Sequence, residues 1–207
     1  MMSDIGEYLD YLFPNPKCEL VYHNDYELLI AIVLSAQTTD VRVNSVTSLL
    51  FSKYNSLEKL KNANINDIEN IIKPIGSFRK KAMYIINIAS ILVDEYDGIV
   101  PKNRDDLIKM PGVGRKTINV FLSEFYNIPA IGVDTHVERV SKRLRLARKN
   151  DSVLTIERKL MKFFPREEWG KRHIQMVLFG RYYCKAIKPD CKNCRLKDIC
   201  IEKKKII

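Results

Sequence analysis

The sequence predicts an all-α protein made of two lobes. Of its 207 residues, 46% are hydrophobic, which is enough for a packed core, and most of them recur at helical spacing in runs bounded by capping residues. Eight glycines and eight prolines are few for an all-β protein of this length. We expect residues 18–128 to form one helical, barrel-like lobe and residues 1–17 to join residues 129–207 in the other.

The net charge of the chain indicates which class of molecule it binds. The formal net charge of +10 favours a polyanion such as nucleic acid, although a ribosomal or membrane-surface protein would share it. No stretch approaches the length of a transmembrane helix, and the acidic N-terminus, M-M-S-D-I-G-E-Y, is unlike a signal peptide. We therefore expect a soluble, intracellular protein without a membrane partner.

The N-terminal part predicts two helices of different character. Residues 1–17 give an amphipathic helix that ends at the prolines of F-P-N-P, and Cys18 beyond it is expected to be a buried thiol. Asn24 and Glu27 form a capping pair before E-L-L-I-A-I-V-L-S-A-Q, a helix with almost no polar face that should lie centrally. On the residues alone, Gln37 at its end is a surface glutamine.

Helices are also expected at residues 41–53, 56–61 and 80–96. A shorter helix lies before the last of these. The capping pair Asn66 and Glu69 opens it, and the next proline ends it.

Nine residues repeat a pattern that is found again further along the chain. I-K-P-I-G-S-F-R-K aligns without gaps on I-K-M-P-G-V-G-R-K, which sets Gly76 on Gly112 and Lys80 on Lys116. The repeat predicts a second tight, basic loop at residues 76–80 between two helices. A match this short also arises by chance in a lysine-rich chain.

The stretch from residue 103 opens with a short helix. Asn103, with Asp106 three residues on, predicts its N-terminal cap, and Leu107 and Ile108 begin its apolar face. Pro111 stops it, because proline lacks an N–H and its ring clashes with the preceding turn.

P-G-V-G-R-K then predicts a hairpin that leads into a second helix at residues 115–125. Gly112 and Gly114 allow a tight turn and the close approach of a phosphate, and the unpaired N–H groups that begin the helix attract an anion. A glycine-rich turn is also common as a simple connection. Lys116, in the first turn of this helix, is either a solvated lysine or an amine beside the bound sugar, able to attack carbon.

Asp134, in G-V-D-T-H-V, is the predicted N-cap of a helix at residues 135–146. Capping is compatible with catalysis. His136 follows in the first turn, where it has either a structural role or a role in the pocket. The cations that end this helix either stabilise its C-terminus or contact DNA. The last helices are expected at residues 156–164 and 169–184.

Four of the five cysteines are crowded near the C-terminus. Cys184, Cys191, Cys194 and Cys200 are separated by six, two and five residues. Thiols this close can wrap one metal centre, whereas disulfides are not expected in an intracellular protein. Zinc is the general alternative for four cysteines, but zinc ribbons usually bring two C-x-x-C pairs and this chain has one.

These motifs together resemble the endonuclease III family of helix–hairpin–helix DNA glycosylases. The resemblance rests on M-P-G-V-G-R-K-T, V-D-T-H-V and the spacing of the cysteines, and it runs from about Tyr26 to Cys200. It implies excision of damaged bases, oxidised pyrimidines such as thymine glycol, from double-stranded DNA, followed by β-elimination at the abasic site through a lysine Schiff base. Lys116 would be the nucleophile, and Asp134 would stabilise the cationic sugar.

The resemblance also implies a cofactor and a setting. A 4Fe–4S cluster would be bound by Cys184, Cys191, Cys194 and Cys200, in a loop at residues 184–200. The protein would act as a monomer on DNA that contains damaged bases or abasic sites, in the cytoplasm at the nucleoid.

Residues that contact DNA follow from the same resemblance. Members of the family insert a glutamine beside the flipped base, matched here by Gln37, and a leucine directly after a glycine, where this chain has Ser77 followed by Phe78. Because an apolar residue unstacks bases, Phe78 can substitute for the leucine. The implied DNA contacts are Gln37, Ser77, Phe78, Arg79, Gly112, Val113, Gly114, Arg115, His136 and Lys188.

Two alternatives stay open from the sequence. An adenine-mismatch glycosylase would share the fold, but such enzymes lack a lysine at position 116 and carry a further C-terminal domain, for which 207 residues leave no room. A non-catalytic DNA-binding module with a zinc loop would share the charge and the cysteines. It would be colourless and inactive.

Overall fold

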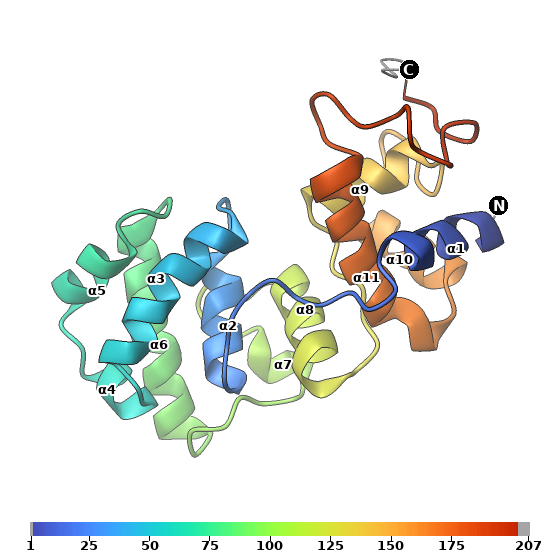
Figure 1. The fold of residues 1–207 in the computed structure, drawn as a ribbon. Coiled ribbons are helices and arrows are strands. Elements are labelled where there is room, and N and C mark those ends of the chain that lie inside the picture. Colours follow the sequence, from blue (N-terminus) through green and yellow to red (C-terminus); the bar gives the residue numbers. More distant parts are fainter. Residues whose placement is uncertain (1, 203–207) are drawn as a thin grey trace. The chain divides into compact units, whose positions relative to one another are not determined.

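The computed structural model describes residues 2–202 and has no β-strand in that part of the chain (Figure 1). The predicted all-α class is confirmed. In chain order the elements are α1 (Met2–Leu12), α2 (Asp25–Leu34), α3 (Asp40–Lys53), α4 (Leu57–Lys61), α5 (Ile65–Ile72), α6 (Phe78–Glu95), α7 (Arg104–Leu107), α8 (Arg115–Tyr126), α9 (Thr135–Arg143), α10 (Val153–Phe163), η1 (Arg166–Glu168), α11 (Trp169–Leu178) and η2 (Phe179–Tyr183).

The chain divides into two compact units, each with its own hydrophobic core. Cys18–Tyr126 is called the hairpin unit here, and Met1–Lys17 with Asn127–Ile207 is called the cysteine unit. The division falls after residue 126, where the sequence had suggested residue 128. That the two units have separate roles stays a prediction.

Helix α2 is the centre of the hairpin unit. Every residue from Glu27 to Leu34 is buried, and the helix packs against α3, α6 and α8. A helix without a polar face is stable only where other elements cover it on all sides. The predicted central position of this helix is therefore confirmed.

Capping residues mark several of the helix starts. The Asn24 side chain accepts a hydrogen bond from the N–H of Glu27 (3.0 Å), as expected for α2. The cap predicted for α5 was wrong: Asn64 caps it by accepting from the N–H of Asn66 (2.9 Å), so the helix starts one residue before the supposed cap. Both asparagines suit a cap, and sequence spacing alone did not separate them.

Two other helix ends differ from prediction. Helix α9 ends at Arg143 rather than at residue 146, because Arg145 has φ +62° and a left-handed residue cannot continue a right-handed helix. Helix α10 begins at Val153, before the predicted residue 156, because Ser152 accepts a hydrogen bond from the N–H of Thr155 (3.2 Å) and caps it.

Helix α11 ends at Leu178 and continues as one π-helical turn, η2, where a single helix to residue 184 was predicted. A Cβ added to Gly180 in this turn would lie 2.8 Å from the Cβ of His136. The wider turn thus occurs where the backbone lies directly against α9.

Two smaller predictions were also wrong. Helix α7 begins at Arg104 and ends at Leu107, and Ile108 is exposed, so neither Ile108 nor Pro111 shapes this helix as expected. Cys18 is half-buried rather than buried, and it packs against the core of the hairpin unit. Among the helices of residues 2–202, none combines the length and the apolar character needed to cross a membrane.

A buried arginine fastens α1 to α11 in the cysteine unit. The Arg172 guanidinium donates to both carboxylate oxygens of Asp10 (2.8 and 3.0 Å) and to the carbonyl of Gly6 (3.0 Å). Gln175 donates to Asp10 (2.9 Å) as well. Burial raises the pKa of the Asp10 carboxyl, but hydrogen bonds from Arg172, Lys171 and Gln175 outweigh it and hold that pKa well below its usual range.

Asp10→Asn should destabilise the protein, since it leaves the buried guanidinium with Glu168 (2.8 Å) as its one remaining carboxylate partner among the described residues. We expect a loss of about 2 kcal/mol in the free energy of unfolding at pH 7, less than for a fully buried pair because the Asp10 carboxylate is partly exposed. Urea denaturation measures it, with Glu167→Gln, an exposed carboxylate of the same unit, as the control.

The loss should depend on pH. A lowered pKa in the folded state means that the charged carboxylate stabilises the protein fully above the ordinary aspartate pKa of about 3.9, and progressively less as the pH falls below it. The native protein and Asp10→Asn should therefore converge in acid. A difference between them that stays constant down to strongly acidic pH would contradict this account.

Candidate functional site

The hairpin between α7 and α8 contains a glycine, Gly112, that no other residue could replace without strain. Gly112 has φ +78°, and an added Cβ would lie 2.5 Å from Cδ2 of Tyr84 on α6 and 3.0 Å from Cγ1 of Val33 on α2. A side chain at this position would meet both the backbone strain and the packed ring. The hairpin is thus seated directly on α2 and α6.

The other residues of the hairpin differ in what they expose. Val113 is buried, and its N–H donates to the carbonyl of Met110 (3.1 Å), so Val113 shapes the hairpin from within and its N–H is already used. Gly114 is exposed, and a Cβ added there would meet nothing within 4 Å. Gly114 therefore opens the N-terminus of α8 to solvent, where the first N–H groups have no partner within the helix.

The two candidate catalytic residues lie at helix N-termini, one in each unit. Lys116 is the second residue of α8 and is half-buried, which agrees with its predicted place in the first turn. Asp134 is the N-cap of α9, and its Oδ1 accepts a hydrogen bond from the N–H of Val137 (2.7 Å). The predicted cap is confirmed. It uses one carboxylate oxygen and leaves the charge in place.

His136, two residues after Asp134, is held by an arginine. Nη2 of Arg139 lies 3.2 Å from Nδ1 of His136 and donates to the carbonyl of Gly180 (2.6 Å), while Nε donates to the carbonyl of Cys184 (3.0 Å). Because a guanidinium can only donate, Nδ1 of His136 accepts, and a neutral ring then carries its proton on Nε2. Arg139 links α9 to η2 and to the first cysteine of the cluster.

Gln37 and Ser77 occupy matching conformations at the tips of two loops of the hairpin unit. Both are exposed, and their φ angles are +60° and +57°, in the left-handed region that non-glycine residues rarely adopt. Gln37 follows the C-terminus of α2, and Ser77 directly precedes α6. The two residues implied to enter DNA are therefore both presented to solvent on strained backbone.

The loop predicted at residues 76–80 is shorter than expected, because α6 already begins at Phe78. Gly76 has no positive φ and no atom within 4 Å of an added Cβ, so it does not repeat the conformation of Gly112. Phe78 is half-buried against the core, and the Arg79 guanidinium lies 5.2 Å from its ring centroid. The sequence repeat was therefore not a structural repeat.

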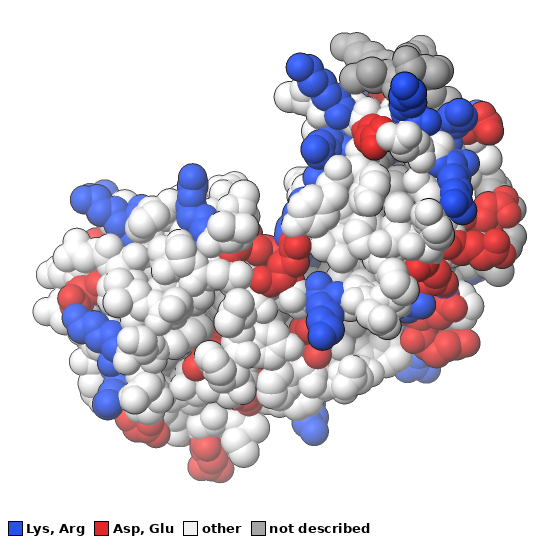
Figure 2. Space-filling model, in the orientation of Figure 1, with Lys and Arg blue, Asp and Glu red and all other residues white. Residues whose placement is uncertain are grey.

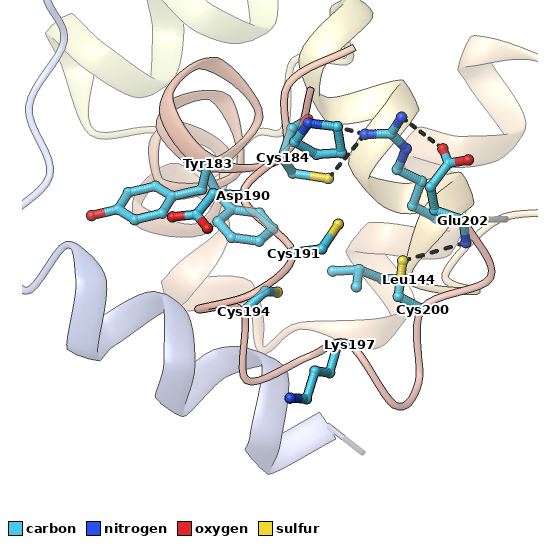
Figure 3. A pocket seen from close by; sticks show the side chains of 12 residues that line it. Leu144, Tyr183, Cys184, Asp190, Cys191, Cys194, Lys197, Cys200 and Glu202 are labelled. Carbon is cyan, nitrogen blue, oxygen red and sulfur yellow. Dashed lines mark hydrogen bonds and ion pairs between the residues drawn. The ribbon is translucent and has the colours of Figure 1, made fainter. Parts of the chain in front are cut away.

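The four clustered cysteines line one pocket, into which their sulfur atoms point (Figure 3). All four are half-buried, and burial raises the pKa of the Cys184 and Cys194 thiols. The Arg143 guanidinium lowers the pKa of the Cys184 thiol against this effect of burial, because its Nη1 donates to Sγ (3.4 Å). The same Nη1 also donates to the carbonyl of Lys185 (2.7 Å). In the described part of the chain, no group of three His, Cys, Asp or Glu residues is placed to hold a single metal ion.

The loop between the cysteines carries exposed cations. Lys188 is exposed with φ +51°, midway between the first two cysteines, and Ile187 beside it is 80% exposed. On the face drawn in Figure 2, basic side chains gather around the end of the cysteine unit where Figure 1 draws this loop. The loop thus offers positive charge to an anionic partner.

Sequence reasoning missed two residues of the hairpin unit. Lys81 contacts the loop that carries Gln37, and Tyr84 contacts the hairpin at Gly112. Lys81 is 5% exposed and lies among the buried positions of α6, in register with Ile85 and Ile88. A lysine within an otherwise apolar stripe is the signal that would have revealed it. Tyr84 carried no comparable signal, because only the folded hairpin shows what its ring covers.

Comparisons with known proteins agree with this geometry. Residues 30–166 match the model of the HhH-GPD superfamily base excision DNA repair proteins. Endonuclease III of Bacillus subtilis is 47% identical over 194 residues, which span 94% of this chain and 89% of that protein. A trapped endonuclease III–DNA covalent intermediate superposes with a TM-score of 0.93 at 48% identity, covering 98% of this chain and 96% of that one. A non-covalent endonuclease III–DNA complex gives the same values.

Gly112→Ala should destabilise the protein far more than Gly114→Ala. Alanine at 112 would add the strain of a left-handed residue and a contact with Tyr84, and we expect a loss of about 3 kcal/mol in the free energy of unfolding. Alanine at 114 meets open space and should change it by less than about 0.5 kcal/mol. Urea denaturation of both variants tests the contrast, and equal losses would show that the contact with Tyr84 does not determine the residue at 112.

Proposed function

The chain belongs to the endonuclease III family of HhH-GPD base excision DNA repair proteins, and from this membership we propose that it removes oxidised pyrimidines from double-stranded DNA. It is a bifunctional enzyme, a DNA glycosylase that also cleaves the strand at the abasic site. One observation carries the proposal: Lys116 lies in the first turn of α8, directly after the hairpin, in a chain that superposes along 98% of its length on a covalent enzyme–DNA intermediate.

The hairpin would bind a phosphate of the DNA backbone. Gly114 leaves the N-terminus of α8 open, and the N–H groups and the positive end of this twelve-residue helix favour an anion there. Arg115 is exposed at the same end and adds a cation. Lys188 in the cysteine loop would contact a further phosphate, because it too is exposed.

The damaged nucleotide would leave the helix and be replaced by residues of the hairpin unit. Gln37 and Ser77 are already exposed and would fill the space that it leaves. Phe78 would unstack the neighbouring bases only if its half-buried ring turned outward from the core. His136, in the first turn of α9, would line the pocket that receives the base.

Lys116 and Asp134 would divide the chemistry between them. The Asp134 carboxylate stabilises the positive charge that develops on the sugar as the bond from C1′ to the base breaks. The Lys116 amine forms a bond to C1′, and opening of the sugar ring gives an imine. Loss of a C2′ proton then expels the 3′ phosphate, and water releases the lysine. An adenine-mismatch enzyme would have no lysine to form this imine.

Cys184, Cys191, Cys194 and Cys200 would hold a 4Fe–4S cluster. Four thiols converge in one pocket, and Arg143 donates to the sulfur of Cys184, which stabilises the thiolate that iron requires. A bound cluster would cross-link the loop that carries Lys188 and keep it folded. We also infer that the enzyme works as a monomer in the cytoplasm, at the nucleoid.

The purified protein should be yellow-brown and should contain iron and inorganic sulfide in equal amounts. The six-two-five spacing and the convergent thiols are the reason for this expectation. Elemental analysis and the visible absorption spectrum measure it. Colourless protein with stoichiometric zinc would instead assign the four cysteines to a zinc site.

Lys116→Gln should abolish the covalent adduct that borohydride traps between enzyme and abasic DNA, while the fold and lesion binding persist. Asp134→Asn keeps the capping oxygen and removes the charge, so excision should collapse in a folded protein. Each loss should correspond to ~3–5 kcal/mol of transition-state stabilisation. Normal trapping by Lys116→Gln would mean that another amine attacks, and Lys80 would be examined first.

Because the charge on Asp134 matters most while the base departs, Asp134→Asn should keep more activity on preformed abasic sites than on damaged bases. Single-turnover rates on the two substrates give this ratio directly. Equal losses on both would assign Asp134 to the lyase steps as well.

A further inference from the structure

Lys81 is a charged side chain in the core of the hairpin unit. It lies on α6 and is only 5% exposed. Burial lowers the pKa of its ammonium, because an ion loses solvation when it leaves water. A residue with this cost needs strong contacts in the fold, and no step of the proposed chemistry uses it.

The contacts of Lys81 are at the C-terminal end of α2. Its Nζ donates to the carbonyl of Leu34 (2.9 Å) and to the carbonyl of Ala36 (2.6 Å). Leu34 is the last residue of α2, and the final carbonyls of a helix lack partners within it and carry its negative end. An ammonium placed there satisfies both carbonyls and fixes the direction of the chain after the helix.

Gln37 follows immediately. The carbonyl of Ala36 belongs to the peptide bond that precedes Gln37, so Lys81 holds one side of the residue with φ +60°. A non-glycine residue in this conformation is strained, and it persists only where surrounding contacts hold it. Lys81 supplies such a contact.

The second exposed tip, Ser77, also contacts Lys81. Ser77, with φ +57°, accepts a hydrogen bond at its carbonyl from the backbone N–H of Lys81 (3.1 Å). This is the first backbone hydrogen bond of α6, which any residue except proline would make at position 81. The Lys81 side chain therefore joins the backbone before Gln37 to the helix whose first turn fixes Ser77.

We propose that Lys81 is a positioning residue that holds the Gln37 and Ser77 tips in one fixed arrangement, ready to fill the space left by the displaced nucleotide. The inference rests on the proposed function, which assigns Gln37 and Ser77 to that space. Lys81 is buried and acts without touching DNA. Its effect on catalysis is transmitted through Gln37.

Lys81→Met tests the proposal, because methionine has a similar length and cannot donate. The probe is a duplex with 2-aminopurine opposite an uncleavable tetrahydrofuran abasic site, whose fluorescence rises when the purine is unstacked. Lys81→Met should bind this duplex with less than half of the native rise. Its kcat for excision should fall roughly 10- to 100-fold with little change in KM, the scale of a misplaced contact group. Borohydride trapping on abasic DNA should persist.

Two comparisons separate positioning from a general loss of structure. Lys59→Met removes an exposed lysine of α4 and the same charge, and it should behave like the native protein. In the Gln37→Ala background, Lys81→Met should cause little further loss, because both changes remove one function. If Lys81→Met lowers the melting temperature too far for assay, Lys81→Gln replaces it. Its shorter amide can still donate to a carbonyl but does not match the reach of the ammonium to both, so the same losses should appear to a smaller degree.

A folded Lys81→Met with native kcat and native fluorescence rise would overturn the proposal. So would a loss that adds in full to that of Gln37→Ala. The fluorescence measurement needs no catalysis, so it tests the role of Lys81 even if the native protein proved unable to excise or trap, the result that would contradict the proposed function instead.

Discussion

Gly112 has no side chain, and the ring of Tyr84 and a methyl group of Val33 fill the space where one would be. This close approach joins the hairpin to α6, an eighteen-residue helix, and to α2, which is buried from Glu27 to Leu34. Because the ring and the methyl group already occupy this space, the hairpin cannot move closer to either helix without a clash. The orientation of Lys116 at the start of α8 thus depends on two helices that carry none of the chemistry.

The same two helices present the residues that we assign to the displaced nucleotide. Gln37 follows the end of α2, Ser77 precedes the start of α6, and Lys81 fastens one to the other. Both tips are strained, and strain concentrates where the surrounding structure holds a conformation that a free chain would leave. The hairpin and the two tips are therefore supported by the same two helices, and the apolar helix α2 leads directly to the exposed Gln37.

Sequence reasoning succeeded where a local rule decides the structure and failed where a distant contact does. The cap at Asp134 and the buried course of α2 follow from residue chemistry within a few positions, and both are observed. The structural repeat predicted at residues 76–80 is absent because the two glycines have different neighbours. A Cβ added at Gly112 would clash with Tyr84, whereas one added at Gly76 would meet nothing within 4 Å. The π turn at Gly180 likewise depends on a contact with His136, far away in the chain, that no spacing reveals.

The net charge is a further property whose meaning depends on contacts that the sequence does not reveal. A formal charge of +10 suits a DNA-binding protein, yet several of these cations are used inside the fold. Arg172 holds Asp10 and the backbone of α1, Arg139 and Arg143 hold carbonyls of the cysteine loop, and Lys81 holds the end of α2. Of the cations at the end of α9, Arg143 contacts the cysteine loop, a use that the sequence did not indicate. The charge available to DNA is therefore smaller than the net charge of the sequence suggests, and it lies on exposed residues such as Lys188.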